Sequence, residues 1–285
     1  MAVVISGKEL ATLKREKMAQ QIPGLIEKYG RAPHLAVVLI GDDAGSVSYV
    51  RGKEKGCNEV GIKNTTLLRD TAITESELLA LIDELNNDDG VDGILVQLPL
   101  PKHINSDKII NAISPEKDVD GFHPRNVASL YLHEKGIIPC TPKGVIALLD
   151  YAGIEIEGRN ACVIGRSNIV GMPVAKLLLD RNATVTVAHS RTKNLSEITS
   201  KADILIAAVG RPLFVKEDMV KEGAAVIDVG VNRNPETGKL CGDVDFKNVK
   251  EKVSFITKVP GGVGPMTITC LLENTIECFI NKMEK

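Results

Sequence analysis

The chain has 285 residues, of which 25% are charged, and a formal net charge of −2 at pH 7. Such a length exceeds the usual size of a single hydrophobic core, so two domains are favoured over one. The near-neutral balance excludes the basic footprint of nucleic-acid or anionic-membrane binding, and we expect neither partner. No apolar run reaches the roughly 20 residues of a membrane span, and the first residues lack a secretory pattern, so we expect a cytoplasmic protein.

Cysteine and histidine usage bears on redox state and metals. The six cysteines form no C-x-x-C pair and stand mostly among apolar neighbours, at positions 57, 140, 162, 241, 270 and 278. This pattern is typical of reduced core thiols rather than of a disulfide framework. The five histidines show no metal-ligand spacing. We therefore predict no metal site.

The first part of the chain has the pattern of an α/β layer. Ser6 with Glu9, and Thr74 with Glu77, are capping-box signatures that precede apolar residues at helical spacing. "HLAVVLIG" and "VDGILVQLPLP" are apolar runs of strand length between these helices. Because the runs are continuously apolar, they indicate parallel strands covered on both faces. We expect an α/β domain from residue 1 to about residue 139.

The same pattern restarts near Thr141. A predicted helix, "PKGVIALLDYAG", precedes the apolar runs "NACVIG", "ATVTVAH", "ADILIAAVG" and "AAVIDVG". Strands in this order, with helical segments between the first three, are typical of a Rossmann-like nucleotide-binding domain. "VPGGVGPMT" then leads into a closing helix from about Pro265. We expect this helix to pack back on the first domain, which gives domains of 1–139 plus 270–285 and of 140–269, sharing a cleft.

The segment "GRSNIVG" follows the first strand of the second domain. Gly165 and Gly171 suit a turn whose backbone N–H groups face a phosphate at a helix start. Ser167 stands where G-x-G-x-x-G has its middle glycine and would offer a hydroxyl, while Arg166 adds a permanent cation. An ordinary strand-to-helix turn is the alternative. A nucleophile elbow at Ser167 is disfavoured because its second glycine is missing.

The second strand of that domain ends in "HSRT". An acidic residue at this point favours the ribose 2′-hydroxyl of NAD, but here Ser190 and Arg191 stand instead. Together with Arg166, they predict a 2′-phosphate guest and therefore NADP.

Tyr49 and Lys53 lie four residues apart in "YVRGKEK", so on a helix they share a face. A lysine partly shielded from water beside an aromatic ring can exchange protons near neutral pH, because burial lowers its pKa. A solvated surface helix is the alternative. Short-chain dehydrogenases carry the same spacing inside their nucleotide domain, whereas here it precedes that domain by over a hundred residues.

Three further stretches suggest a second ligand. Gln97 ends a buried strand, where α/β sheets place ligand groups, although it could also cap a neighbouring loop. Asp118 and Asp120 in "EKDVDGF" could accept two parallel hydrogen bonds from a pterin or guanine edge, or form a plain turn. "PGGVGP", residues 260–265, suggests backbone pressed against a flat ligand.

Taken together, "YVRGKEKGCNEVGI", "VQLPLP", "KDVDGF", "PCTPKGV", "GRSNIVGMP", "VTVAHSRT" and "VPGGVGPMT" resemble the bifunctional methylenetetrahydrofolate dehydrogenase and methenyltetrahydrofolate cyclohydrolase family. The resemblance spans nearly the whole chain in the right order. It implies NADP-dependent oxidation of methylenetetrahydrofolate to methenyltetrahydrofolate, followed by hydrolysis to formyltetrahydrofolate. It also implies a homodimer with the folate held between the domains.

By position, the resemblance implies that Lys53 is the key catalytic group, that Gln97 tunes it, that Tyr49 stacks on the folate and that Asp120 grips the pterin. Further substrate-binding residues would be Val96, Leu98, Pro260, Gly261, Gly262, Val263 and Gly264. The NADP site would be lined by Gly165, Arg166, Ser167, Ser190, Arg191 and Val231.

The chain departs from the family pattern at Ala128 and Ser129, where glycine and arginine are common, and at Lys258, where proline is common. These changes bear on loop shape and substrate affinity rather than on the type of reaction. Two alternatives stay open: a dehydrogenase without cyclohydrolase activity, and a nucleotide-sensing regulatory protein on the same fold.

Overall fold

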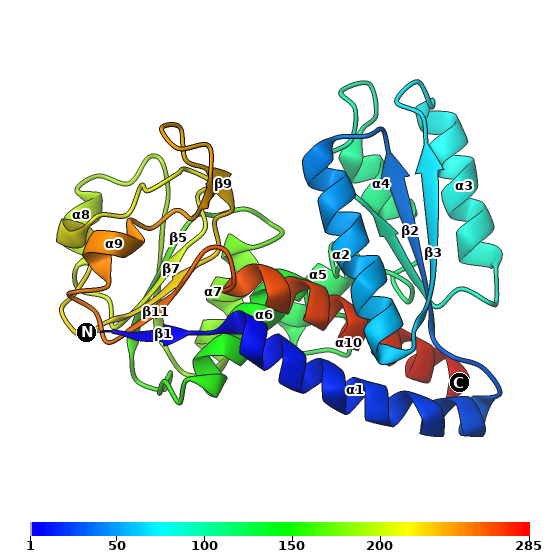
Figure 1. Ribbon diagram of the computed structural model, residues 1–285, viewed down its shortest axis with the longest axis horizontal. Helices are drawn as coiled ribbons and strands as arrows, with labels where there is room; N and C mark the ends of the chain where they lie inside the picture. The colour runs from blue at the N-terminus through cyan, green and yellow to red at the C-terminus, as the bar shows by residue number, and fades with distance from the viewer. Residues whose placement is uncertain (1) are drawn as a thin grey trace. The chain divides into compact units, whose positions relative to one another are not determined.

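The computed structural model describes residues 2–285 and divides into two compact units (Figure 1). Unit 1 holds Thr141–Thr267 and the residues up to Thr12, and unit 2 holds Leu13–Cys140 and Ile268–Lys285. The chain passes between the units at three points, which lie in α1 (Gly7–Tyr29), at the start of α6 (Cys140–Tyr151) and in α10 (Val263–Met283).

Unit 2 is built on a three-stranded parallel sheet. Its strands run in the order β3 (Lys63–Arg69), β2 (His34–Ile40) and β4 (Gly93–Val96). Every residue of β2 and β4 is buried, which confirms the two continuously apolar runs as interior parallel strands. The third strand was not expected, because Leu67 and Leu68 are its only large apolar residues.

Helices cover both faces of this sheet, with α2 (Ala44–Val60) and α3 (Glu75–Asn87) on opposite sides in Figure 1. The capping box of Thr74 and Glu77 is present at the start of α3. One core cluster joins α3 and α4 (Ser106–Ala112) to alternate residues of β2 and β4. The unit also holds α5 (Pro124–Leu132) and the later turns of α1.

Within unit 2, helix α10 packs closely on α2. A Cβ added at Gly52 would lie 3.1 Å from Cδ1 of Ile268, and one at Gly56 would lie 3.2 Å from Cδ1 of Leu272. Two small residues one turn apart therefore bring the helices together. The prediction that the closing helix packs on the first domain is confirmed for the residues from Ile268 onward.

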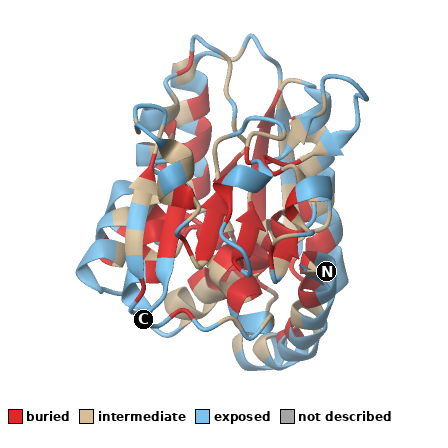
Figure 2. Cartoon of the chain, turned by 90° about the vertical axis from the view of Figure 1, so that its left-hand side faces the viewer, coloured by how far each residue is buried: buried red, intermediate tan, exposed pale blue. Residues whose placement is uncertain are grey.

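Unit 1 is built on a six-stranded parallel sheet, whose strands are the buried centre of the view in Figure 2. The order is β1 (Val3–Ile5), β11 (Phe255–Thr257), β8 (Ala225–Asp228), β7 (Ile204–Ala207), β5 (Asn160–Ile164) and β6 (Thr184–Ala188). Strands β6 and β7, which both follow β5 in the sequence, pair on either side of it. This is the strand reversal at which doubly wound sheets bind nucleotides, and the expected Rossmann-like arrangement is confirmed.

The connections of unit 1 are short. They are the helices α6 (Cys140–Tyr151), α7 (Gly171–Asp180), α8 (Leu195–Thr199) and α9 (Phe246–Val249), the 3₁₀ helix η1 (Glu217–Met219) and the antiparallel pair β9 (Asn232–Arg233) and β10 (Leu240–Cys241). Helix α7 packs on β5 and β6, and Leu195, Ile198 and Val249 pack into a core cluster on the sheet.

The first twelve residues differ from the expected division, which placed them with the first domain. Val3–Ile5 pairs in parallel with Phe255–Thr257 and so extends the sheet of unit 1. A strand of three residues has no readable period, and its partner lies some 250 positions away, so sequence pattern could not reveal the pairing.

All six cysteines are free thiols, which confirms the reduced state expected for them. Among residues 2–285, no helix is long and apolar enough to cross a membrane. Over the same residues, no group of three or more His, Cys, Asp and Glu side chains is arranged to hold a metal ion.

Candidate functional site

Lys53 is a buried amine on helix α2, with 6% of its surface exposed. Its Nζ donates a hydrogen bond of 2.9 Å to Oε1 of Gln97. Burial lowers the pKa of Lys53, and the negative charge of Asp120 opposes that shift. The alternative of a solvated surface lysine is therefore wrong. A buried amine with a lowered pKa is suited to proton transfer.

Gln97 is oriented by its own backbone neighbourhood. It follows β4, and its backbone N–H donates to the carbonyl of Val38 at 2.9 Å. The side-chain Nε2 donates to the carbonyl of Leu98 at 2.6 Å, so the amide oxygen faces Lys53. The amide thus bonds to its own loop and also contacts the lysine, while its role toward a ligand stays a prediction.

Asp118 and Asp120 have different surroundings although they lie two residues apart. The carboxylate of Asp118 accepts hydrogen bonds from the backbone N–H of Gly121 and His123 and from Nδ2 of Asn126. It therefore holds the turn. Asp120 interacts electrostatically with Lys53, and burial raises its pKa. Of the two carboxylates, Asp120 is the one placed beside the amine.

The other predicted substrate residues of unit 2 lie near this cluster. Val96 and Leu98 line a small cavity together with Asp118 and Asp120. Tyr49 stands one helical turn before Lys53 and is half-buried, and this burial raises the pKa of its phenol. The unit therefore places an aromatic ring, an amine, an amide and a carboxylate around β4 and α2.

The loop from Pro260 to Gly264 belongs to unit 1 and leads into α10. A Cβ added at Gly7 would lie 1.8 Å from the carbonyl oxygen of Gly262, and the N–H of Lys8 donates to the carbonyl of Gly261 at 3.0 Å. The close contact with this loop therefore explains why Gly7, at the start of α1, is a glycine, whereas a Cβ at Gly262 would lie 2.8 Å from the carbonyl oxygen of Lys258. The prediction that the loop borders a ligand stays a prediction.

The turn from Gly165 to Gly171 joins β5 to α7. A Cβ at Gly165 would meet the carbonyl oxygen of Ala208 at 2.2 Å, and one at Gly171 would meet that of Gly165 at 2.3 Å. Both glycines are thus demanded by backbone packing at the strand reversal. Ser167 Oγ accepts from the N–H groups of Val170 and Gly171 at 3.2 and 3.3 Å, which caps α7 and leaves the hydroxyl proton for a guest.

Basic and hydroxyl side chains surround this turn at the carboxyl ends of the strands. Arg166, Ser190 and Arg191 are exposed, and Val231, which follows β8, is 49% exposed. A hydrogen bond within the loop after β6 holds its conformation, because Nδ1 of His189 accepts from the backbone N–H of Arg191 at 3.1 Å. Exposed cations and a hydroxyl at the end of β6 fit a dinucleotide that carries an additional phosphate.

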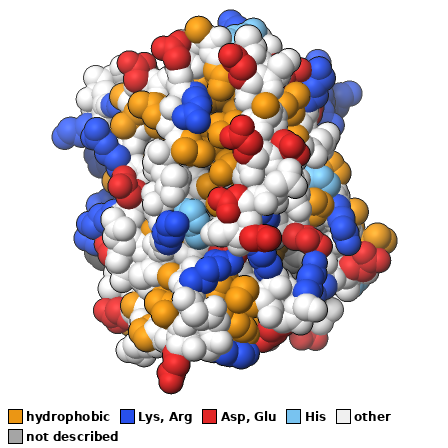
Figure 3. Space-filling model, turned by 90° about the vertical axis from the view of Figure 1, so that its right-hand side faces the viewer, with side chains coloured by type: hydrophobic (Ala, Val, Ile, Leu, Met, Phe, Trp, Pro, Cys, Tyr) orange, Lys and Arg blue, Asp and Glu red, His pale blue; other side chains and the backbone are white. Residues whose placement is uncertain are grey.

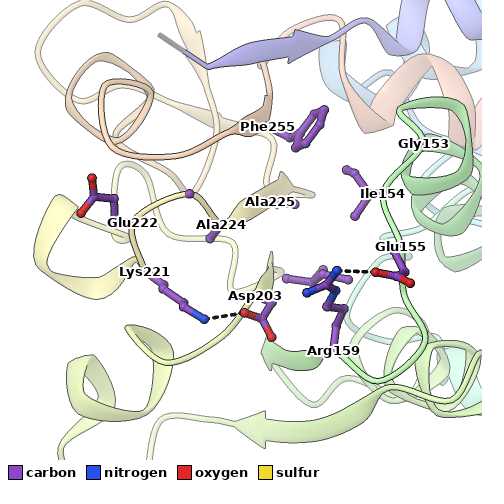
Figure 4. Close-up of a pocket in the computed structure, with 12 residues that line it drawn as sticks. Gly153, Ile154, Glu155, Arg159, Asp203, Lys221, Glu222, Ala224, Ala225 and Phe255 are labelled. Carbon is purple, nitrogen blue, oxygen red and sulfur yellow. Dashed lines mark hydrogen bonds and ion pairs between the residues drawn. The ribbon is translucent and has the colours of Figure 1, made fainter.

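A separate depression of about 440 Å³ lies at the opposite, amino ends of the same strands (Figure 4). Lys221 Nζ pairs with Asp203 Oδ1 at 2.6 Å, and Arg159 pairs with Glu155. Open α/β sheets bind ligands at the carboxyl ends of their strands, and the cations here already have partners. We therefore do not assign the cofactor to this depression.

Sequence reasoning missed three groups that organise these sites. Cys140 donates from Sγ to the carbonyl of Val119 at 3.2 Å and interacts with both Lys53 and Asp120. Asp228 and Asp243 are buried in unit 1, at the end of β8 and after β10. "VIDVG" and "GDVDF" each set an acid in an apolar stretch, which is an available signal because a buried carboxylate needs partners.

Of the three departures from the family pattern, Ser129 has a clear packing role. It is buried in α5, and a Cβ added at Gly136 would lie 2.7 Å from the Cβ of Ser129. Ala128 and Lys258 carry none of the contacts described above.

Comparison with known proteins gives matches along the whole chain. Residues 5–120 match the model of the tetrahydrofolate dehydrogenase/cyclohydrolase catalytic domain. Residues 139–283 match the model of the NAD(P)-binding domain of the same enzymes. The bifunctional protein FolD of Bacillus pumilus is 57% identical over 276 residues, which cover 97% of each chain.

Two solved structures are similar over their full length. The bifunctional enzyme FolD of Campylobacter jejuni has a TM-score of 0.96 and 50% identity, covering 99% of this chain and 100% of that one. The Trypanosoma brucei dehydrogenase-cyclohydrolase, complexed with NADP cofactor and inhibitor, has a TM-score of 0.95 and 38% identity, covering 100% and 99%. The chain belongs to the tetrahydrofolate dehydrogenase/cyclohydrolase family.

Proposed function

We propose that the protein oxidises methylenetetrahydrofolate to methenyltetrahydrofolate with NADP and then hydrolyses the product to formyltetrahydrofolate. The relatives named as bifunctional enzymes support both steps. The observation that carries the proposal is the buried Lys53 amine, held 2.9 Å from the oxygen of Gln97 and beside Asp120. A protein that only sensed nucleotides would not need this cluster.

For the first step, NADP supplies the hydride acceptor when it is bound. The residues of the chain position the folate, because loss of hydride from the methylene carbon yields a cation shared by two nitrogens and needs no strong base. In our proposal, Asp120 accepts paired N–H bonds from the pterin edge, and the ring of Tyr49 stacks on the folate.

For the second step, water adds to the methenyl carbon, and the bond from that carbon to one of its two nitrogens then breaks. One proton of the added water passes to the released nitrogen, and the other proton must leave. Neutral Lys53 is suited to take it, since an ammonium would repel the cationic substrate. Burial favours the neutral amine. The hydrogen bond to Gln97 uses one N–H of Lys53, which aims the lone pair away from the amide. A dehydrogenase without cyclohydrolase activity would not need this arrangement.

The choice of NADP over NAD rests on the groups around the strand reversal of unit 1. Arg166, Ser190 and Arg191 would receive the 2′-phosphate, because no carboxylate stands at the end of β6 to receive a ribose hydroxyl. Gly165 and Ser167 would border the pyrophosphate at the start of α7, and Val231 would contact the nicotinamide half.

We assign the folate chemistry to unit 2 and the binding of NADP to unit 1, with the loop Pro260–Gly264 bordering the substrate. Acidic and basic side chains are intermixed on the face in Figure 3, and we propose no nucleic-acid partner. We also propose a homodimer. Strand β3 pairs only with β2 and leaves Leu68 62% exposed, so its free edge is available to a second copy. A cytoplasmic location stays a prediction.

One assay tests the proposed reactions. Purified protein is mixed with methylenetetrahydrofolate and either NADP or NAD, and absorbance is followed for the reduced nicotinamide and for the methenyl product. We expect reduced NADP to accumulate without a lasting methenyl signal. A lasting methenyl signal would indicate the dehydrogenase alone, and a preference for NAD would contradict the roles of Arg166, Ser190 and Arg191.

A further inference from the structure

The loops that leave β7 and β8 converge on one buried carboxylate, Asp243. Its Oδ2 accepts hydrogen bonds from the backbone N–H of Val209 at 2.7 Å and of Gly210 at 3.1 Å. Its Oδ1 accepts from the N–H of Arg211 and from Nδ2 of Asn232, both at 2.8 Å. Asp243 has no exposed surface. Four donors from two loops therefore depend on one side chain.

A second carboxylate fixes the segment that carries Asp243. Asp228, the last residue of β8, accepts from the N–H groups of Gly230 and Asp243 at 3.0 and 2.9 Å through Oδ1. Its Oδ2 accepts from the N–H of Val244 at 2.9 Å. A Cβ added at Gly230 would lie 2.2 Å from Oδ1 of Asp243, so the backbone after β8 packs directly on the carboxylate.

The same loops stand at the strand reversal of the sheet. Ala208 directly precedes the three N–H donors. Its carbonyl oxygen would lie only 2.2 Å from a Cβ added at Gly165. A shift of the loop after β7 would therefore press on the turn between β5 and α7. In sheets of this type the dinucleotide crosses the carboxyl ends of the strands. With the ribose phosphate read at β6, the nicotinamide half lies over the loops after β7 and β8.

We propose that Asp243 is a positioning residue for the cofactor: it presets the loops after β7 and β8 that receive the nicotinamide half, without touching the cofactor itself. This inference rests on the proposed NADP-dependent function. It assigns a role to an acid that is buried beneath the site and paired only with groups of the chain.

The role requires a carboxylate rather than an amide. A carboxylate only accepts hydrogen bonds and can take two at each oxygen, as Asp243 does. In Asp243→Asn, one oxygen is replaced by an NH₂ group that faces N–H donors. Two of the four donors then lose their acceptor, and the loop must move to relieve the contact.

The test measures binding of NADP⁺ to the full-length protein by titration calorimetry, without folate. We expect Asp243→Asn to raise the Kd for NADP⁺ by about tenfold or more, since bonds to a charged group are among the stronger ones. The matched control is Asp245→Asn, whose carboxylate pairs with Lys216 and Asn248 instead of these loops. Its Kd is expected to stay within about twofold of the unchanged protein.

A second readout separates positioning from general damage. Hydrolysis of methenyltetrahydrofolate is assayed without NADP, and we expect Asp243→Asn to retain it. If Asp243→Asn does not fold, Asn232→Ala removes one of the four bonds and should raise the Kd about two- to fivefold.

An unchanged Kd in a folded variant overturns the proposal, as does an equal loss of hydrolysis and of NADP⁺ binding. If the unchanged protein itself fails to bind NADP⁺, the proposed function fails instead.

Discussion

Unit 2 contains two buried lysines, and their surroundings differ in kind. Lys53 is 6% exposed and Lys117 is 8% exposed, and burial lowers the pKa of both amines. Lys53 donates to one side chain, that of Gln97. Lys117 donates to three backbone carbonyls that end α3, those of Leu85, Asn86 and Asp88.

We infer from this difference that Lys117 supports the fold, whereas Lys53 is suited to the chemistry proposed for it. Three fixed carbonyls accept from Lys117, which satisfies the end of a helix. A single amide oxygen leaves Lys53 free to exist as an amine with a directed lone pair. Burial alone does not distinguish the two lysines, but the number and type of their acceptors do.

The largest expected effect follows from removing the reactive amine. Lys53→Met should lower cyclohydrolase activity by about 10²- to 10⁴-fold while part of the dehydrogenase activity remains, because only the hydrolysis needs proton transfer. Both rates are measured spectrophotometrically. Lys55→Met is the matched control, since that side chain is 78% exposed on the same helix. Equal loss of both activities would contradict the assigned role.

A second test changes the acceptor of Lys53 and keeps the amine. In Gln97→Glu, a carboxylate 2.9 Å away would raise the pKa of Lys53, because it favours the ammonium. The cyclohydrolase rate should fall by at least about tenfold at neutral pH and recover as the pH rises. Gln97→Met should lower the rate without moving the pH profile upward. Identical pH profiles for the two variants would refute the proposed tuning.

Replacing Lys117 should lower the stability of the protein rather than its rate of catalysis. Lys117→Met leaves three carbonyls without their donor and should lower the free energy of unfolding by about 1–3 kcal/mol. Denaturant unfolding measures this, with Lys108→Met as the control because its pair with Glu75 is exposed. The kcat of the folded variant should change little. A loss of rate like that of Lys53→Met would contradict the difference in role between the two lysines.

The smallest effect is the pH dependence contributed by His34. Nδ1 donates to the carbonyl of Gly90 at 2.8 Å, so Nε2 accepts from the hydroxyl of Thr65 at 2.9 Å. Burial lowers the pKa of His34, so below about pH 6.5 the unfolded chain binds a proton before the folded one does. Stability should therefore fall as the pH drops below that value, and less so in His34→Gln. Equal slopes for the two proteins would show that the ring is not held neutral.

Local patterns predicted much of the fold and part of the site. Apolar runs identified β2, β4 and the four strands β5 to β8 of unit 1, and the spacing of Tyr49 and Lys53 placed both on α2. The sequence could not separate the roles of Asp118 and Asp120, since the difference lies in which N–H groups fold around each one. It also missed Asp243, whose three backbone donors stand more than thirty positions earlier in the chain.

The pairing of β1 with β11 bears on how the protein is made. Strand β1 can find its partner only after Phe255–Thr257 has been synthesised. Unit 2, encoded between them, also waits for the residues from Ile268 onward. Neither unit can complete its packing during most of translation, at about 5–20 residues per second. The nascent chain must therefore keep the edges of both sheets from wrong partners for many seconds.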